Sequence, residues 1–250
     1  MKDENVEQLD QLRETLQKAK SVVALTGAGV SAESGVPTFR EAQTGLWARY
    51  QPEKLATSDA FLEDPPLVWE WYAWRRELVS SAEPNPAHRA LVALENYYPN
   101  FALITQNVDG LHAEAGSRNI IELHGNISRV KCFNAHHPVE NWDALEGSPP
   151  HCPLCGSLLR PDVVWFGEML PEQALISALG AMQDCEVYFS IGTSALVHPA
   201  AALTVEAIKD LDVTVVEINP AETPITPYVD FALNGSAGQI LPELVDLLVL

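Results

Sequence analysis

The sequence predicts an α/β fold in which a parallel sheet is covered by helices on both faces. Short apolar runs recur at Ser21–Thr26, Phe101–Thr105, Ile120–Leu123, Val187–Ile191 and Val213–Ile218. Runs of this kind are typical of strands that are buried on both faces. Stretches with helical character lie between several of these runs, and strands that alternate with helices favour parallel pairing.

Helices are expected at both ends of the chain and between the strands. Val6, Leu9, Leu12 and Leu16 share one face of the opening segment, which is the pattern of an amphipathic helix. The closing helix has Ser236 as its expected cap. This closing helix covers residues 239–248, and the other helical stretches that the sequence predicts in its second half are residues 174–182 and 200–210.

Two segments interrupt the alternation. Residues 36–85 are rich in Trp, Tyr and Pro and contain a helix that should begin after Asp64-Pro65-Pro66, and residues 129–160 hold three of the four cysteines. We expect these insertions to form a smaller module, with a helical part and a cysteine-containing lobe. The rest of the single 250-residue unit would form the parallel-sheet core, from residues 1–35, 86–128 and 161–250.

Composition limits the classes of function. No apolar run approaches the roughly 20 residues that cross a bilayer, and the N-terminus lacks the basic start and apolar stretch of a secretory signal. A cytoplasmic protein without a membrane partner is therefore expected. The formal net charge of -19 argues against binding nucleic acid, because phosphates would be repelled. It weakly favours cationic partners such as lysine-rich peptides, although acidic surfaces more often serve solubility.

A glycine-rich turn indicates a dinucleotide site. Residues 27–32 (GAGVSA) follow the first strand and match the G-x-G-x-x-G/A pattern that brings backbone N–H groups to a pyrophosphate. A conventional dehydrogenase would place an acidic residue at the end of a second strand about 20 positions later. The chain instead continues into residues 33–40 (ESGVPTFR), and a strand end suited to a ribose appears only at Val215–Asn219. The layout therefore differs from that of hydride-transfer enzymes.

Five motifs resemble signatures of the sirtuin family, in the family's order and over nearly the whole chain. They are residues 27–40, 105–112 (TQNVDGLH), 122–125 (ELHG), 164–168 (VWFGE) and 192–194 (GTS). The resemblance implies a Rossmann-like parallel-sheet domain with a smaller inserted module. It also implies an NAD-dependent protein lysine deacylase that releases nicotinamide, an O-acyl-ADP-ribose and free lysine.

The resemblance assigns the chemistry to individual residues. His124 would be the catalytic base that accepts a proton from a ribose hydroxyl, a task suited to a pKa near 7. Asn107 and Asp109 would be the other catalytic residues and would hold the nicotinamide ribose and carboxamide, while Phe39 would shield the reacting face. The NAD-binding residues that the resemblance implies are Gly27, Ala28, Gly29, Ser31, Ala32, Glu33, Thr38, Phe39, Arg40, Gln106, Asn107, Asp109, Gly192, Thr193, Ser194, Asn219 and Ala237.

An acylated lysine peptide is the expected partner. It would add as a strand beside residues 164–168, with main-chain pairing that reads little peptide sequence. The substrate-binding residues that this implies in the segment are Val164, Phe166, Gly167 and Glu168.

The acyl group is predicted from the helix in the first insertion. Tyr72 and Arg75 are three residues apart and share a helix face. A hydroxyl and a guanidinium would suit the carboxylate of a succinyl, malonyl or glutaryl group. Spacing alone also fits an Arg75 on a solvated face. The Tyr-x-x-Arg pattern, together with Ala42, resembles the bacterial-type desuccinylase and demalonylase class of sirtuins. A plain deacetylase, a mono-ADP-ribosyltransferase and a non-catalytic NAD sensor stay as alternatives.

The cysteines leave two alternatives, a lobe that binds zinc and a lobe without a metal. Sirtuins usually hold a structural zinc with two Cys-x-x-Cys pairs, of which Cys152 and Cys155 form the second. Cys132 would begin the first pair, but Ala135 occupies its second position. A tetrahedral site needs four N or S ligands. Either the three cysteines bind zinc with one of His136, His137 and His151, or the lobe has lost its metal. The second interpretation is favoured because no histidine occupies position 135.

Overall fold

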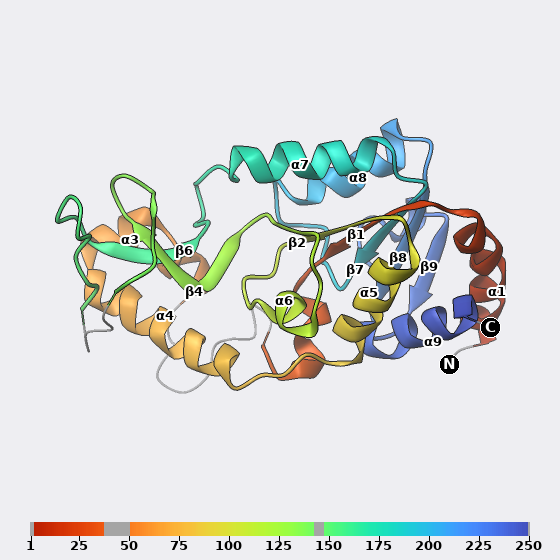
Figure 1. Ribbon diagram of the computed structural model, residues 1–250, viewed down its shortest axis with the longest axis horizontal. Helices are drawn as coiled ribbons and strands as arrows, with labels where there is room; N and C mark the ends of the chain where they lie inside the picture. The colour runs from red at the N-terminus through yellow and green to blue at the C-terminus, as the bar shows by residue number, and fades with distance from the viewer. Residues whose placement is uncertain (1–2, 38–50, 143–147, 250) are drawn as a thin grey trace.

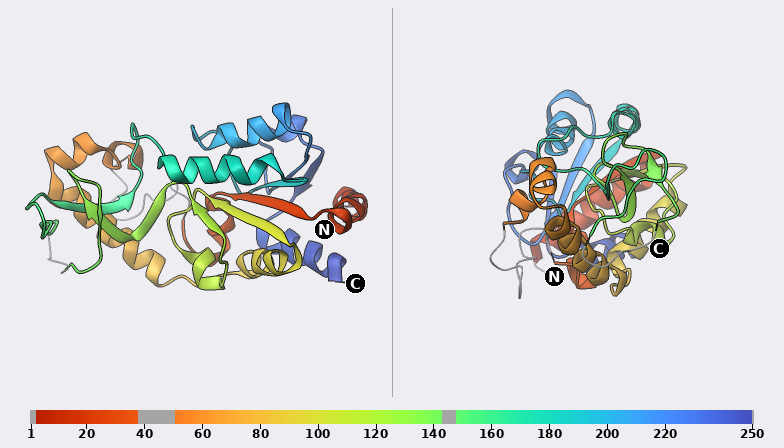
Figure 2. Two further views of the ribbon diagram at one scale, coloured as in Figure 1. Left: turned by 45° about the horizontal axis from the view of Figure 1, so that its top comes forward. Right: turned by 90° about the vertical axis from the view of Figure 1, so that its left-hand side faces the viewer.

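The molecule is elongated, with a large sheet and its helices at one end and a smaller module at the other (Figure 1). The computed structural model describes residues 3–37, 51–142 and 148–249. The same separation is visible when the molecule is turned (Figure 2). The expected NAD or acyl contacts of Thr38, Phe39, Arg40 and Ala42 lie outside the described residues.

The large sheet is parallel throughout, with the strand order β3-β2-β1-β7-β8-β9. The predicted α/β class with a Rossmann-like parallel sheet is confirmed. All five predicted strands form, and β9 is an additional one. The strands are β1 (Ser21–Thr26), β2 (Asn100–Thr105), β3 (Ile120–Glu122), β7 (Val187–Ile191), β8 (Thr214–Asn219) and β9 (Phe231–Asn234).

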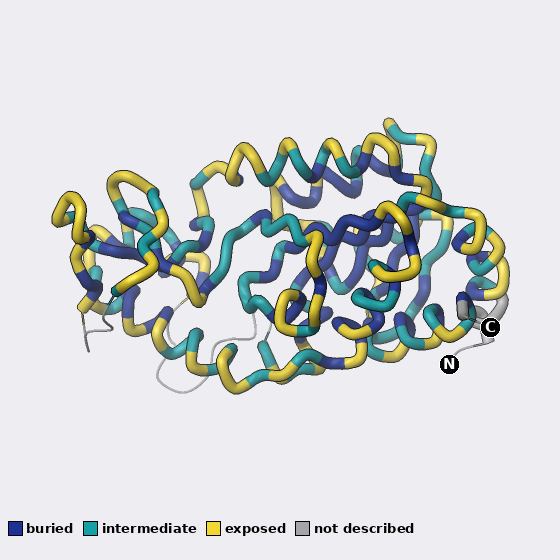
Figure 3. Tube along the Cα trace, in the orientation of Figure 1, coloured by how far each residue is buried: buried dark blue, intermediate teal, exposed yellow. Residues whose placement is uncertain are grey.

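Helices cover both faces of this sheet because its central strand is apolar on both sides. Val22 and Ala24 of β1 pack into one hydrophobic cluster, and Val23 and Leu25 pack into the other. Side chains of successive strand residues point to opposite faces, and Figure 3 shows burial concentrated along the sheet. The first cluster includes residues of α1 (Asp3–Lys18), α5 (Pro86–Tyr97) and α9 (Ala237–Val249), and the second includes residues of α7 (Glu172–Gln183) and α8 (Ala201–Asp210).

The smaller module is a three-stranded antiparallel sheet that packs against helices. Its strand order is β5-β4-β6, with β4 at Gly125–Cys132, β5 at Pro138–Val139 and β6 at Leu159–Val163. This sheet extends a few residues beyond the second predicted insertion on each side, and the division of the chain into core and module stays a prediction. The helices of the first insertion are α2 (Pro52–Leu55), α3 (Ser58–Glu63) and α4 (Pro65–Ser80).

The start of α4 follows from local chemistry. The Asp64 carboxylate accepts a hydrogen bond from the backbone N–H of Leu67 at 3.1 Å, and Pro65 and Pro66 occupy the first turn, where no N–H is needed. The buried face of α4 carries Trp71 and Tyr72 into an aromatic cluster. Among the helices that the structure describes, none is long and apolar enough to cross a membrane.

Candidate active site

The glycine-rich turn lies where the strand order of the large sheet reverses. β1 has β2 on one side and β7 on the other, and the carboxyl ends of β1 and β7 at such a switch point are where sheets of this kind usually have their ligand crevice. Gly29 N donates to Gly192 O at 2.8 Å. A Cβ on Gly27 would lie 2.8 Å from the same oxygen. Glycine is therefore required here by contact between two loops, in addition to the predicted approach of a phosphate.

The segment after Gly27 forms two short 3-10 turns, η1 (Ala28–Val30) and η2 (Ala32–Ser34). Glu33 then links this loop to the beginning of α9. Its carboxylate accepts hydrogen bonds from Ser236 Oγ at 3.0 Å and Gly238 N at 2.7 Å. The structure thus brings Glu33 beside Ala237, two residues of the predicted NAD set that lie near opposite ends of the chain.

Asn107, Ser31 and Asp109 form one directed hydrogen-bond chain in the crevice. Asn107 Nδ2 donates to Gly27 O at 3.1 Å and to Ser31 Oγ at 3.2 Å. Ser31 Oγ donates to Asp109 Oδ2 at 2.7 Å, and Leu111 N donates to Asp109 Oδ1 at 3.0 Å. Burial raises the pKa of Asp109, against the opposing effect of these donors and of the Arg75 charge. These contacts hold the side-chain amide of Asn107 and the carboxylate of Asp109 in place.

His124 follows β3 and is half-buried. Its Nδ1 lies 3.0 Å from Gln106 O. A carbonyl oxygen can only accept, so Nδ1 carries the proton and Nε2 carries the lone pair. Burial lowers the pKa of His124, and the bond to Gln106 partly opposes this shift. The imidazole is therefore neutral at neutral pH, with Nε2 as a basic atom.

Gln106 carries an unsatisfied donor. Its side-chain Nε2 is buried and has no hydrogen-bond partner among the described residues. A buried amide N–H that stays unbonded costs about 1–3 kcal/mol. A ligand oxygen at this position would remove that cost, which fits the predicted contact of Gln106 with a ribose hydroxyl.

Two buried histidines lie beneath this network. His112 Nε2 is 3.0 Å from Thr26 Oγ1, and the rings of His112 and His88 are 4.8 Å apart. Burial lowers the pKa of His88 to about 4 and that of His112 to about 3, so both rings are neutral. His88 Nε2 lies 3.5 Å from Ser31 Oγ. The sequence motifs did not indicate that a buried histidine would contact Ser31.

The loops after β7 and β8 complete the crevice. Asn219 Nδ2 donates to Thr193 O at 2.7 Å, and Thr193 Oγ1 accepts from Ala195 N at 2.9 Å. The structure therefore brings the GTS motif and the end of β8 together, as the predicted NAD set requires. Glu217 of β8 is buried, and its carboxylate accepts from Thr223 Oγ1 and Thr226 Oγ1, each at 2.5 Å. That carboxylate stabilises the loop after β8.

The predicted peptide segment lies directly beside His124. Val164 N donates to His124 O at 3.0 Å, and Phe166 N donates to Ala56 O at 2.9 Å. Phe166 is about half exposed. Gly167 has a φ of 87°, in the left-handed region that favours glycine. The segment that follows β6 therefore runs from the catalytic histidine candidate to the helices of the module.

Glu168 was expected to contact the substrate, but its carboxylate is engaged within the protein. It accepts from Trp165 N at 2.8 Å and Ser58 Oγ at 3.2 Å, and it forms an ion pair with Arg160. Burial raises the pKa of Glu168, but the hydrogen bonds from Arg160 and Trp165 outweigh this effect and hold the pKa below its usual range. Glu168 thus fixes the shape of the segment.

Arg160 is a residue that sequence reasoning missed. It is fully buried, and besides Glu168 it donates to Val163 O at 2.8 Å. The local signal was weak, because β6 (LRPDV) also carries Asp162 and only burial shows that Arg160 needs an acidic partner.

Tyr72 and Arg75 lie near the same segment. Tyr72 is buried, and its hydroxyl accepts from Trp165 Nε1 at 2.9 Å. The Arg75 guanidinium is 5.0 Å from the Trp71 ring and 5.6 Å from the Tyr72 ring. Burial lowers the pKa of Arg75, whereas the nearby Tyr72 and Asp109 oppose this shift. Arg75 therefore lies within electrostatic reach of the crevice.

A separate cluster occupies the cysteine lobe. The ligand atoms of Cys132, His137 and Cys152 all lie within 4.8 Å of one another. The metal-free lobe was favoured because no histidine occupies position 135, whereas the structure brings His137, one of the three alternative ligands, close to Cys132 and Cys152.

Comparison with known proteins identifies the class. Residues 27–199 match the Sir2 family. An NAD-dependent protein deacylase 1 from Archaeoglobus fulgidus is 51% identical over 237 residues, which cover 94% of this chain and 96% of the relative. An enzyme of the same name from Pseudomonas aeruginosa is 47% identical over 240 residues, 93% of this chain and 96% of the relative. The chain belongs to the Sir2, or sirtuin, family, which confirms the predicted resemblance.

Solved structures agree with this assignment. The crystal structure of a Sir2 homologue in complex with NAD is 50% identical, has a TM-score of 0.90, and aligns over 96% of this chain and 93% of that chain. A Sir2 protein bound to a myristoylated histone peptide is 32% identical, with a TM-score of 0.76 and 97% of each chain aligned.

Proposed function

We propose that this protein is an NAD-dependent protein lysine deacylase that removes acidic acyl groups, succinyl and malonyl above all. The products would be nicotinamide, an O-acyl-ADP-ribose and free lysine. The observation that carries the proposal is the orientation of His124, whose Nε2 is available as a base beside the Asn107–Ser31–Asp109 chain. The names of its bacterial and archaeal relatives support the same activity.

NAD would supply the electrophilic ribose carbon and the nicotinamide leaving group. The protein's part is to bind, orient and exclude water. Asn107 and Asp109 would hold the carboxamide and ribose, and the unpaired Gln106 Nε2 would donate to a ribose hydroxyl. His124 Nε2 would accept the proton of a ribose hydroxyl, since Nδ1 is already committed to Gln106 O at 3.0 Å.

The peptide would bind beside residues 164–168. This segment hydrogen-bonds to His124 O through Val164 N at 3.0 Å, so an acyl-lysine held along it would be directed toward the base. The internal bonds of Glu168 keep the segment in one conformation before the substrate binds. The structure of the relative with a myristoylated histone peptide supports an acylated peptide as the substrate class.

The acidic acyl preference depends on Tyr72 and Arg75. The Tyr72 hydroxyl accepts a hydrogen bond from Trp165 of the peptide segment. The Arg75 guanidinium lies over the ring of Trp71, which belongs to the same aromatic cluster. An acyl carboxylate near Arg75 would gain a charge-assisted hydrogen bond in a half-buried setting, where screening by salt is weak. An acetyl group has no carboxylate and would gain nothing from this contact.

The test is the rate of nicotinamide release with NAD and matched succinyl-, acetyl- and unmodified lysine peptides. We expect the succinyl peptide to be the fastest. His124→Asn keeps a donor toward Gln106 O but lacks the base, so we expect kcat/KM to fall about 10²–10⁴-fold. Because burial lowers the pKa of His124, the rate should fall with acidification only below about pH 6.5.

Arg75→Met tests the acyl group, with Arg76→Met as the matched control. The control removes a neighbouring positive charge whose guanidinium lies 4.8 Å from the ring of Trp69, an α4 residue that packs against Cys132 and Cys152. Only Arg75→Met should lower the ratio of succinyl to acetyl activity. An acetyl preference in the unaltered protein would contradict the acidic pocket, while labelled protein without O-acyl-ADP-ribose would indicate a transferase. Binding of NAD without nicotinamide release would indicate a sensor.

A further inference from the structure

The cysteine lobe contains three of the four ligands of a tetrahedral site and lacks the fourth where the family places it. Cys132 ends β4, and Cys152 and Cys155 lie in the loop before β6. Position 135, the expected fourth ligand, is an alanine. Cys132 and Cys152 are buried against Trp69 of α4. Packing therefore holds the sulfur atoms of Cys132 and Cys152, whereas Cys155 is exposed.

The hairpin after Cys132 turns His137 back toward the cysteines. Cys132 N donates to His137 O at 2.9 Å, and His136 N donates to Cys132 O at 3.0 Å. His136 has a φ of 57°, in the left-handed region, which reverses the chain within a few residues. In this turn position 137 lies across from Cys132, because Lys131 and Pro138 are paired between β4 and β5. A ligand at 137 can thus stand in for one at 135.

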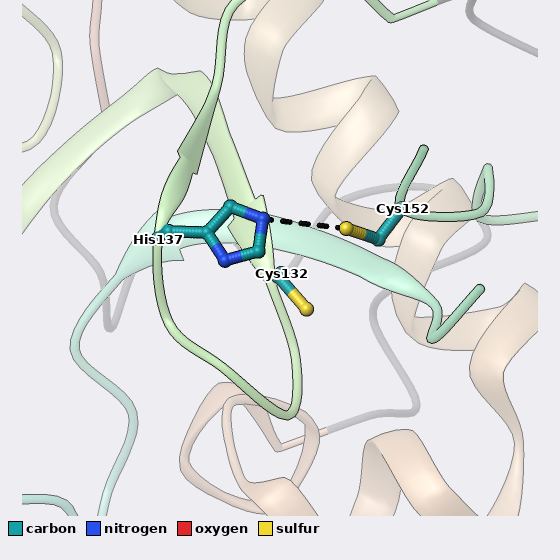
Figure 4. A group of neighbouring side chains, drawn as sticks. All are labelled: Cys132, His137 and Cys152. Carbon is teal, nitrogen blue, oxygen red and sulfur yellow. Dashed lines mark hydrogen bonds between the residues drawn. The ribbon is translucent and has the colours of Figure 1, made fainter. Parts of the chain in front are cut away.

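The distances fit a zinc site. Cys132 Sγ lies 3.5 Å from Cys155 Sγ, and Cys152 Sγ lies 3.3 Å from His137 Nε2. Zinc–sulfur bonds of about 2.3 Å and zinc–nitrogen bonds of about 2.0 Å place tetrahedral ligands roughly 3.5–3.8 Å apart. The two sulfurs are too far apart for a disulfide, whose length is about 2.05 Å. Figure 4 shows the His137 ring turned toward the Cys152 sulfur.

The other nearby histidines are placed less well. His151 is exposed, and its Nδ1 lies 2.8 Å from Gly156 O. His136 is exposed at the tip of the turn. Among the described residues, the group of potential metal ligands within mutual reach consists of Cys132, His137 and Cys152 and includes neither of these two histidines. Cys155 lies outside that group but approaches it through Cys132, with 3.5 Å between the two Sγ atoms.

We propose that Cys132, His137, Cys152 and Cys155 bind one structural zinc ion, with His137 in the place of the cysteine that the chain lacks. Cys132, Cys152 and Cys155 would release their protons and bind as thiolates, and His137 would bind through Nε2. The Ala135 N–H, 3.4 Å from Cys132 Sγ, would stabilise the thiolate. The ion would hold the β4–β5 hairpin to the loop before β6 and support Trp69 of α4. This inference does not depend on the proposed deacylase activity.

The experiment measures bound zinc and its affinity in the full-length protein, by elemental analysis and by competition with a chromophoric chelator. We expect about one zinc per chain. Loss of one of the four ligands should weaken binding in His137→Ala by more than the roughly 10–100-fold that loss of an outer-shell partner costs. His136→Ala is the matched control, since it removes the adjacent histidine, and it should keep the affinity of the unaltered protein. Ala135→Cys in the His137→Ala background should restore binding.

Cobalt substitution keeps the proposal testable if His137→Ala fails to fold. Replacing the zinc by Co(II) gives visible bands whose positions report the ligand set. The unaltered protein should show a tetrahedral spectrum of three sulfurs and one nitrogen, and His137→Cys should show stronger thiolate charge-transfer absorption. An unchanged spectrum in His137→Cys, or unchanged zinc affinity in His137→Ala, would overturn the assignment. Zinc binding only after Ala135→Cys is introduced would also overturn it and would identify a lobe that has lost its metal.

Discussion

The two sheets of this protein are stabilised by different interactions. The central strands of the parallel sheet carry apolar side chains on both faces, as in Val22–Leu25 of β1. The antiparallel sheet instead places charged residues on its strands, including Arg129, Lys131, Arg160 and Asp162, and joins them in ion pairs. Its remaining stability comes from an aromatic cluster and from the cysteine lobe.

This difference determines how well each region can be predicted. The free energy of hydrophobic burial is non-directional and nearly proportional to the apolar area buried. A run of apolar residues therefore predicts a buried strand without knowledge of the residues that it packs against. An ion pair or a metal site depends on one particular partner, which the chain can supply from a distant position. The following predictions test whether the small module depends on such specific partners more strongly than the large sheet does.

The largest effect on stability is expected from Arg160→Met. The change removes a fully buried cation and leaves the Glu168 carboxylate without its ion-pair partner, which should cost about 3–5 kcal/mol of the free energy of unfolding. Arg129→Met is the matched control on the same sheet, since Arg129 is 49% exposed, and it should cost at most about 1 kcal/mol. Denaturant unfolding measures both, and similar costs would contradict the role of Arg160.

Acidification should destabilise the large-sheet region through His88 and His112. Burial lowers their pKa values to about 4 and about 3, whereas both rings take up protons near pH 6.5 in the unfolded chain. Their stabilising effect is therefore complete above pH 6.5 and is lost as the pH falls. We expect a loss of about 2–4 kcal/mol between pH 6.5 and pH 5.

Denaturant unfolding at a series of pH values measures this slope, and two variants separate its sources. His112→Asn should reduce the slope, because one of the two buried rings is removed. His136→Asn changes an exposed histidine of the module and should leave the slope as it is. An equal reduction in both variants would show that the buried pair does not set the pH dependence.

A smaller effect is expected from Gly27→Ala at the crevice. The new Cβ would lie 2.8 Å from Gly192 O and 2.9 Å from Thr193 Cα, so the loops after β1 and β7 must separate, at a cost of about 1–3 kcal/mol. Gly180→Ala is the control, because the α7 glycine has open space around it, and it should stabilise the protein by about 0.5–1 kcal/mol. Thermal unfolding distinguishes the two signs, and a neutral Gly27→Ala would show that the loops can move apart freely.

The smallest effect is expected from Tyr72→Phe in the aromatic cluster. Loss of the hydroxyl leaves the buried Trp165 Nε1 without the acceptor that it has at 2.9 Å, which should cost about 1–2 kcal/mol. A double-mutant cycle with Trp165→Phe isolates this bond from the loss of packing. A coupling energy near zero would mean that the hydroxyl matters only for the substrate.

Much of the fold followed from local patterns. The runs at residues 21–26 and 187–191 became strands with the same bounds, and Asp64-Pro65-Pro66 began α4 as predicted. The strand β9 (Phe231–Asn234) was missed because it is short and mostly half-buried, so it lacks the apolar run of an inner strand. The short helices α2 and α3 were missed because four to six residues are too few for a helical period to appear.

The candidate site was predicted from motifs, and its internal contacts were not. The motifs placed His124, Asn107 and Asp109 in one site, but nothing local indicated that Ser31 joins Asn107 to Asp109 or that Gln106 O fixes the tautomer of His124. The sequence likewise predicted Glu168 as a substrate contact, and nothing local indicated that Glu168 forms an ion pair with Arg160.

The sequence by itself determined the parallel α/β class and the family, and it supplied the candidate site residues, because apolar runs and contiguous motifs are local properties of the chain. The tertiary structure alone determined which long-range partners meet. Glu33 meets the start of α9, Arg160 meets Glu168, and His137 meets Cys152. Such contacts depend on distance and direction in three dimensions, to within a few tenths of an ångström, and spacing along the chain carries no information at that scale.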